Sequence, residues 1–123
     1  MSTTTSLLIA LAGGCGAMTR FSVDGALRAR WPTRFPWQTL TINVSGSLLL
    51  GILTGLVLFH AQPTTLTAIA GTGFCGGYTT FSTASFESIR LLQQRTYLLA
   101  ATNAIATPLL SITAAGAGLL LTH

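Results

Sequence analysis

Four long apolar segments, separated by short polar stretches, run through the chain. They cover approximately residues 6–21, 37–60, 66–92 and 97–121. The second, for example, exceeds the roughly 20 residues that an α-helix needs to cross the hydrocarbon core of a bilayer. The first is not preceded by the basic side chains of a secretory signal, so we expect it to persist as a membrane helix. The pattern predicts an all-α integral membrane protein, with four transmembrane helices in a single domain over residues 1–123.

Charged residues are scarce: they make up 7% of the chain, whereas about a quarter is usual for a soluble domain. This composition favours a multi-pass protein of the cell's inner (plasma) membrane, in contact with the lipid bilayer. The net charge of +4 comes from arginines, which form no basic stripe with interleaved aromatic residues, so we expect no nucleic-acid partner. The sequence also lacks a GxSxG motif, a phosphate-binding glycine loop and paired carboxylates, so we expect no enzymatic activity.

The third segment carries the unusual stretch GTGFCGGYTTFSTASFE at residues 71–87. Glycine accepts backbone conformations that other residues avoid, and threonine and serine offer the backbone competing hydrogen bonds, so we predict a break in the helix at residues 75–80. Inside a membrane, broken backbone survives only where it is buried in protein or lines a polar cavity. Its carbonyls can then hold a cation and its amides an anion. The alternative is a glycine-rich face that lets two helices approach closely.

Polar side chains interrupt two other segments. Asn43 lies inside the second segment, where it either lines a wet path or forms an interhelical hydrogen bond. Asn103, Thr107 and Ser111 are spaced by four residues in the last segment and therefore share one face of a helix. This stripe suggests a hydrated path, but hydroxyls bonded to the carbonyls of their own helix would produce the same pattern.

The arginines are distributed unevenly among the connections. The set comprises Arg20, Arg28, Arg30, Arg34, Arg90 and Arg95. With four spans, both termini lie on one side of the membrane and the arginine-bearing regions lie on the other. The positive-inside rule then predicts that this chain by itself inserts with both termini outside the cell. Glu87 is expected to form an ion pair with Arg90, three residues later.

Four motifs, in this order, resemble the small fluoride channels of the Fluc (CrcB) family. They are GGCGAMTRF at residues 13–21, WQTLTINVSG at 37–46, GTGFCGGYTTFST at 71–83 and the late Ser111. The third motif is long and specific. The resemblance implies a four-helix subunit that pairs with an antiparallel second copy in a dual-topology dimer. Two pores at the dimer interface would let fluoride leave the cell passively, down its electrochemical gradient, and so relieve fluoride toxicity.

The resemblance also implies a site. The expected fluoride path comprises Asn43, Phe81, Ser111, Thr39, Ser82, Thr83, Thr107 and Arg20. In that path the asparagine and the late serine would donate hydrogen bonds, and the phenylalanine would present its ring edge. A structural sodium ion (Na+) at the dimer centre would be bound by the backbone carbonyls of Gly76 and Thr79.

Two features depart from the family pattern. Ala84 stands where the family usually has a second pore phenylalanine, and Phe86 points roughly 200° away on an α-helix, so it does not replace the missing ring. The arginine distribution disfavours inserting the same chain in both orientations, as an antiparallel homodimer requires. Both departures fit an alternative, in which the chain belongs to a heterodimer with an oppositely charge-biased homologue, either as a subunit that conducts only beside its partner or as a non-conducting structural subunit.

A small proton-coupled multidrug exporter, also built from four helices in antiparallel pairs, is a further alternative. Its mechanism requires an ionisable residue inside the first helix. Here the first apolar segment holds no acid before Asp24, and the other acid, Glu87, lies at a helix end. The exporter is therefore disfavoured.

Overall fold

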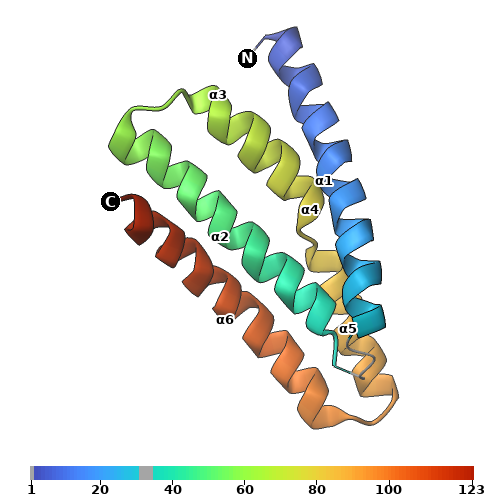
Figure 1. The fold of residues 1–123 in the computed structure, drawn as a ribbon. Coiled ribbons are helices and arrows are strands. Elements are labelled where there is room, and N and C mark those ends of the chain that lie inside the picture. Colours follow the sequence, from blue (N-terminus) through green and yellow to red (C-terminus); the bar gives the residue numbers. More distant parts are fainter. Residues whose placement is uncertain (1, 31–34) are drawn as a thin grey trace.

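The computed structural model describes residues 2–30 and 35–123, without the side chains of Phe81 and Ser82. The described residues form helices and short connections, with no strand among them. Figure 1 shows α1 at one side of the bundle and α6 at the other, with α2 and the broken third span between them. Successive spans run in opposite directions, so the two termini lie towards the same end as the connection between α2 and α3.

The first helix, α1 (Thr3–Arg30), is longer than the segment predicted over residues 6–21. From its composition, the polar stretch after that segment would form an interfacial loop or a short surface helix. Instead the helix continues into it as far as Arg30. Within this part, the Nε of Arg28 donates to Asp24 at 3.0 Å, one turn earlier. Such a pair supports helix beyond the apolar part of the sequence. The apolar pattern alone therefore ends this helix too early.

The long helices α2 (Trp37–His60) and α6 (Tyr97–Thr122) pack against each other along most of their length. A Cβ atom on Gly51 of α2, or on Gly118 of α6, would clash with the backbone of the facing helix. Glycine on both helices therefore lets the two backbones approach closely, as small residues do in other membrane helix pairs.

The third span is broken, as the sequence predicts. Its parts are α3 (Thr64–Leu66), the π-helix η1 (Thr67–Cys75), α4 (Gly76–Tyr78) and α5 (Phe81–Gln93). Between α4 and α5 the chain is extended, with ψ of 159° at Thr79 and φ of −153° at Thr80. None of the glycines in the described ranges has a positive φ. The two threonines, and not glycines in special conformations, therefore form the break.

The glycines before the break pack against α1. A Cβ atom on Gly77 would clash with the carbonyl of Gly13, and one on Gly16 would clash with the carbonyl of Phe74. Small residues on both elements thus bring the backbones of α1 and the third span into contact. The stretch is both a helix break and a glycine-rich packing face, two roles between which its residues alone do not decide.

Charged side chains join α1 to α5 at the far end of the bundle from the termini. Glu87 is 2% exposed, and its carboxylate pairs with Arg90 and lies 3.7 Å from the guanidinium of Arg28. The ion pair predicted from the three-residue spacing is therefore present, and α1 adds a second arginine. Two arginine-bearing regions meet at this end of the molecule. Arg34, which the sequence analysis assigns to the same side, lies outside the described residues.

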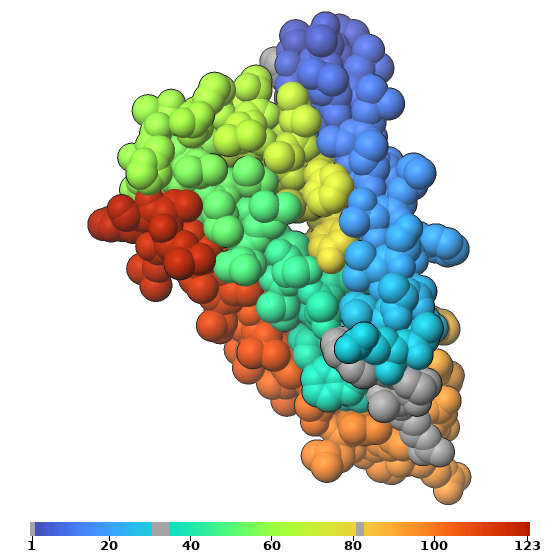
Figure 2. Space-filling view, viewed as in Figure 1, coloured from blue at the N-terminus to red at the C-terminus, as the bar shows by residue number. Residues whose placement is uncertain are grey.

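The surface of the bundle is apolar. Leu98, Phe21 and Leu120 are 80%, 81% and 77% exposed, respectively, and so much exposed apolar surface requires a lipid environment. Within the described ranges, α1, α2 and α6 are each long and apolar enough to cross a membrane, and the divided span lies beside α1 and α2 (Figure 2). The chain is an all-α, multi-pass protein of the cell membrane, with its third span broken.

Candidate functional site

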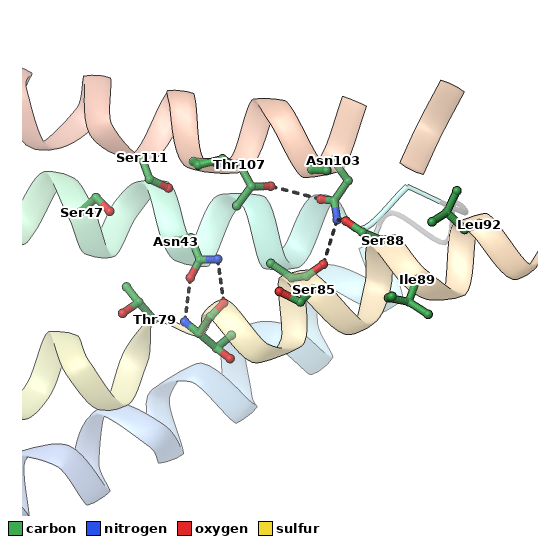
Figure 3. A pocket seen from close by; sticks show the side chains of 14 residues that line it. Asn43, Ser47, Thr79, Ser85, Ser88, Ile89, Leu92, Asn103, Thr107 and Ser111 are labelled. Atoms are coloured by element: carbon green, nitrogen blue, oxygen red, sulfur yellow. Dashed lines mark hydrogen bonds between the residues drawn. The ribbon is translucent and has the colours of Figure 1, made fainter. Parts of the chain in front are cut away.

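A groove with a volume of about 510 Å³ lies between α2, α5 and α6 at the level of the break (Figure 3). Its polar lining consists of Asn43 and Ser47 from α2, Thr79 and Thr80 from the break, Ser85 and Ser88 from α5, and Asn103, Thr107 and Ser111 from α6. The other lining residues are apolar, and no charged side chain occurs in this described lining. The groove therefore offers hydrogen bonds without offering a formal charge.

Asn43 holds the break from α2. Its Nδ2 donates to the carbonyl of Thr80 at 2.9 Å, and its Oδ1 accepts from the amide of the same residue at 2.8 Å. Because peptide groups inside a membrane must be satisfied by protein, this side chain takes the place of helical partners. The second hydrogen on Nδ2 is left for the groove. Asn43 thus forms an interhelical bond and lines the groove as well.

Asn103 holds α5 from α6, and its side chain is almost completely buried. Its Nδ2 donates to the Oγ of Ser88 at 2.8 Å and to the carbonyl of Ala84 at 3.2 Å. Its Oδ1 accepts from the hydroxyl of Thr107 at 3.1 Å. Both amide hydrogens are therefore in use, and the hydrogen of Thr107 points to Asn103 (Figure 3).

Ser111 behaves differently from its neighbour Thr107 on the same helix face. Its Oγ is buried and has no hydrogen-bond partner in the part of the chain that the structure describes. A buried hydroxyl without a partner is rare in folded proteins and calls for a water molecule or a ligand. Of the two hydroxyls that α6 contributes to the groove, that of Thr107 is bonded within the protein, whereas that of Ser111 has no partner in the described structure.

The backbone carbonyls of Gly76 and Thr79 fit a cation. In an uninterrupted α-helix the carbonyl of Gly76 would accept the amide of Thr80, which donates to Asn43 instead. The carbonyl of Thr79 likewise loses the amide of Thr83, which donates to the hydroxyl of Thr80 at 3.2 Å. Both residues line a smaller cavity of about 270 Å³. Carbonyls released by a helix break can coordinate Na+ in membrane proteins.

The other residues of the expected fluoride path do not meet in the groove. Thr39 is buried in the first turn of α2, Thr83 is half-buried at the start of α5, and Arg20 is half-buried within α1. None of these three belongs to the described lining of the groove. The side chains of Phe81 and Ser82 lie outside the described part of the chain. The structure therefore gathers the asparagine of α2 and the two hydroxyls of α6 from the expected set.

Five polar residues of the groove were expected neither in the fluoride path nor at the sodium site: Ser47, Thr80, Ser85, Ser88 and Asn103. Asn103 was placed on the polar stripe, but its part in holding α5 was not foreseen. Thr80 belongs to the hydroxyl run that signals the break. Ser88 follows Ala84 by one helical turn, so the two share a face, but nothing in the sequence says that α6 passes beside that face.

Comparison with known proteins finds relatives that cover most of the chain. It is 52% identical over 113 residues to "Fluoride-specific ion channel FluC 1" of Leifsonia xyli subsp. xyli, which covers 92% of this chain and 82% of that protein. It is 41% identical over 122 residues to "Fluoride-specific ion channel FluC" of Pyrococcus abyssi, which covers 98% of both chains. These names describe ion channels, not enzymes, and lend no support to the exporter. Residues 7–119 match the family described as "CrcB-like protein, Camphor Resistance (CrcB)", and the chain belongs to this family.

Proposed function

We propose that the chain is a subunit of a fluoride-selective ion channel in the cell membrane. Fluoride would pass out of the cell down its electrochemical gradient, which relieves fluoride toxicity. The observation that carries the proposal is the groove, where uncharged hydrogen-bonding side chains line a cavity of about 510 Å³ within a membrane domain. The names of the relatives, which cover most of the chain at up to 52% identity, support fluoride as the ion.

The donors in the groove suit a small anion. Fluoride is tightly hydrated, so a selective path must replace its water with close hydrogen-bond donors. Asn43 offers an amide hydrogen, and Ser111 offers a buried hydroxyl without a partner in the described structure. Thr107 uses its hydrogen on Asn103, so it shapes the path without binding the ion. The ring edge of Phe81 would add a further positive group. Neutral donors also let the ion leave, as conduction requires.

A second subunit and a sodium ion complete the proposed channel. The carbonyls of Gly76 and Thr79 would hold sodium together with the same carbonyls of an antiparallel copy. The open surface at Gly76 supports this arrangement, because a Cβ atom there would meet nothing within 4 Å in its own subunit. Bound sodium supplies a partner for the released carbonyls and a positive potential near the anion path.

A heterodimer is the second form of this proposal. Arg28 and Arg90 converge on one carboxylate, so the arginine bias is concentrated at one end of the folded bundle and favours a single orientation in the membrane. Ala84 presents only a methyl group to the groove. In this form the chain conducts only beside a homologue with the opposite charge bias.

Reconstitution of the purified chain tests the proposal. Liposomes loaded with potassium fluoride receive valinomycin, and an electrode follows fluoride release, with chloride-loaded liposomes as the control. Fast fluoride release without chloride release is expected from a homodimeric channel. If the folded chain alone releases no fluoride, but releases it after co-expression with a homologue of opposite charge bias, the result supports the heterodimer. The proposal is overturned if no fluoride is released either by the chain alone or with the homologue, or if chloride is released as fast as fluoride.

The sodium site is tested separately, through association of the subunits. Replacing sodium by a large organic cation during purification is expected to shift dimers towards monomers in analytical ultracentrifugation. Gly76→Ala is expected to do the same in the presence of sodium. Gly14→Ala is the matched control, because its Cβ also meets nothing within 4 Å. Dimers that persist without sodium contradict the structural role of the ion.

A further inference from the structure

The hydroxyl of Ser88 departs from the usual hydrogen bonding of hydroxyls in membrane helices. Such hydroxyls usually satisfy themselves by donating to a carbonyl one turn earlier in the same helix. Examples here, at 2.7–2.9 Å, are Thr19, Thr54, Thr102 and Thr113. The hydroxyl of Ser88 has one hydrogen-bond partner in the described structure, the Nδ2 of Asn103, and the hydroxyl oxygen is the acceptor in that bond. Its own hydrogen is therefore not used within the described chain.

The carbonyl that Ser88 would normally use is that of Ala84. Within α5 this carbonyl accepts the backbone amide of Ser88, and it also accepts the Nδ2 of Asn103 at 3.2 Å. A carbonyl oxygen has two lone pairs, so both are taken. Asn103 thus occupies the carbonyl of Ala84, to which the hydroxyl of Ser88 would otherwise donate. It also fixes the position of the Oγ of Ser88 by donating to it.

The direction left for the hydrogen of Ser88 is the groove, which this residue lines. Figure 3 shows Ser88 beside Asn103 towards one end of the groove and Ser111 towards the other. The two hydroxyls come from α5 and α6, respectively, and neither donates to another described residue. They are placed to meet an ion at successive positions along the groove.

We propose that Ser88 is an additional anion-binding donor of the groove and that Asn103 is the positioning residue that turns its hydroxyl hydrogen into the path. The ligand class is a small, strongly hydrated anion. This inference rests on the proposed function, for which fluoride is the ion. Asn103 itself has no hydrogen to give, since both of its amide hydrogens are bonded within the protein.

Substitution of Ser88 tests the donor. Ser88→Ala is expected to slow fluoride release about tenfold, the effect of losing one hydrogen bond to an ion. Ser88→Thr keeps the hydroxyl and should retain most of the flux. Thr102→Val is the matched control, because it removes a hydroxyl bonded to the carbonyl of Leu98, and it should stay within about twofold. Equal losses in Ser88→Ala and Ser88→Thr would indicate a packing role and overturn the proposal.

The positioning role of Asn103 is tested by a double substitution. In the Asn103→Leu background the carbonyl of Ala84 is released, and the hydroxyl of Ser88 can bond back to its own helix. Ser88→Ala should then have no further effect on fluoride release. An additional tenfold loss in that background would show that Ser88 acts without Asn103.

A binding measurement separates this inference from the proposed function. Fluoride is added to the purified chain in detergent, with chloride as the reference, and the rise in unfolding temperature is recorded for the wild type and Ser88→Ala. Flux that Ser88→Ala leaves unchanged overturns the role of Ser88 but not the channel. If the wild type releases no fluoride from liposomes, the unfolding temperatures decide. A fluoride-dependent rise in unfolding temperature that is lost in Ser88→Ala supports the binding role of Ser88, and a rise that Ser88→Ala retains overturns it. Absence of both flux and rise in the wild type overturns both proposals.

Discussion

Two buried asparagines hold the groove in opposite ways. Asn43 bonds to the amide and the carbonyl of Thr80, whereas Asn103 bonds chiefly to the hydroxyls of Ser88 and Thr107. The backbone groups at the break cannot turn to another partner without moving the chain. Hydroxyls can rotate towards the carbonyls of their own helices. The same residue type is therefore a backbone cap at one site and an orienting group at the other.

The different partners of the two asparagines predict different effects of substitution, on stability at one site and on ion transfer at the other. Around the break, side-chain hydrogen bonds and glycine contacts hold the backbone, so a substitution there should change folding first. Between α5 and α6, the hydrogen bonds decide where hydroxyl hydrogens point, so a substitution there should change ion transfer first. Three substitutions, in order of decreasing effect on stability, test this distinction.

Asn43→Leu should have the largest effect, because it removes both Asn43 partners from the peptide groups of Thr80. Each buried polar group that loses its partner costs about 1–3 kcal/mol, so we expect a loss of about 2–6 kcal/mol in the free energy of unfolding, together with loss of fluoride flux. Unfolding in detergent micelles measures the first quantity. Thr54→Val, on the same helix, removes a hydroxyl bonded to the carbonyl of Leu50 and should change stability by less than about 0.5 kcal/mol. Equal stabilities of the two variants would refute the capping role.

Gly77→Ala should have an intermediate effect, because the added methyl group meets the carbonyl of Gly13 and pushes α1 away from α4. Overpacking of this kind costs about 1–3 kcal/mol. Gly14→Ala, on α1, adds the same methyl group where nothing lies within 4 Å and should be neutral. The unfolding temperatures of the two variants are compared with that of the wild type. An unchanged unfolding temperature for Gly77→Ala would mean that packing against α1 does not stabilise the break.

Asn103→Leu should have the smallest effect on stability, about 1 kcal/mol or less, which is typical of a side-chain hydrogen bond between membrane helices. The hydroxyls of Ser88 and Thr107 can return to carbonyls of their own helices, so no buried group is stranded. Fluoride release should nevertheless fall, which yields a folded but slow protein in liposomes. A stability loss as large as that of Asn43→Leu would erase the distinction between the two asparagines.

Much of the fold is predictable from local properties of the chain. The length of each apolar segment and the scarcity of charge indicate helices that cross a membrane, and the hydroxyl run indicates the break. The predicted end of the first helix is wrong because the pair between Asp24 and Arg28 extends it through a polar sequence. The π-helix before the break was not predicted. Its Gly73 packs against Ala12 and Ile9 of α1, a contact between distant parts of the chain that the sequence does not reveal.

The site was less predictable than the fold. Asn43 and Ser111 were identified from a family resemblance, and the spacing of α6 placed Thr107 on the same face. The spacing could not show that Thr107 directs its hydrogen to Asn103 while Ser111 has no described partner. Hydroxyls on one helix face look alike in sequence, and their difference arises from the neighbours that each one meets.

The sequence by itself determined a broken four-span membrane protein and its family, because apolar length, charge content and motif order are properties of the chain. The tertiary structure alone decided which hydroxyls can reach an ion. The deciding bonds join Asn43 to a residue 37 positions away and Asn103 to one 15 positions away. Such bonds exist only after the helices have packed, and they determine where each remaining hydrogen points.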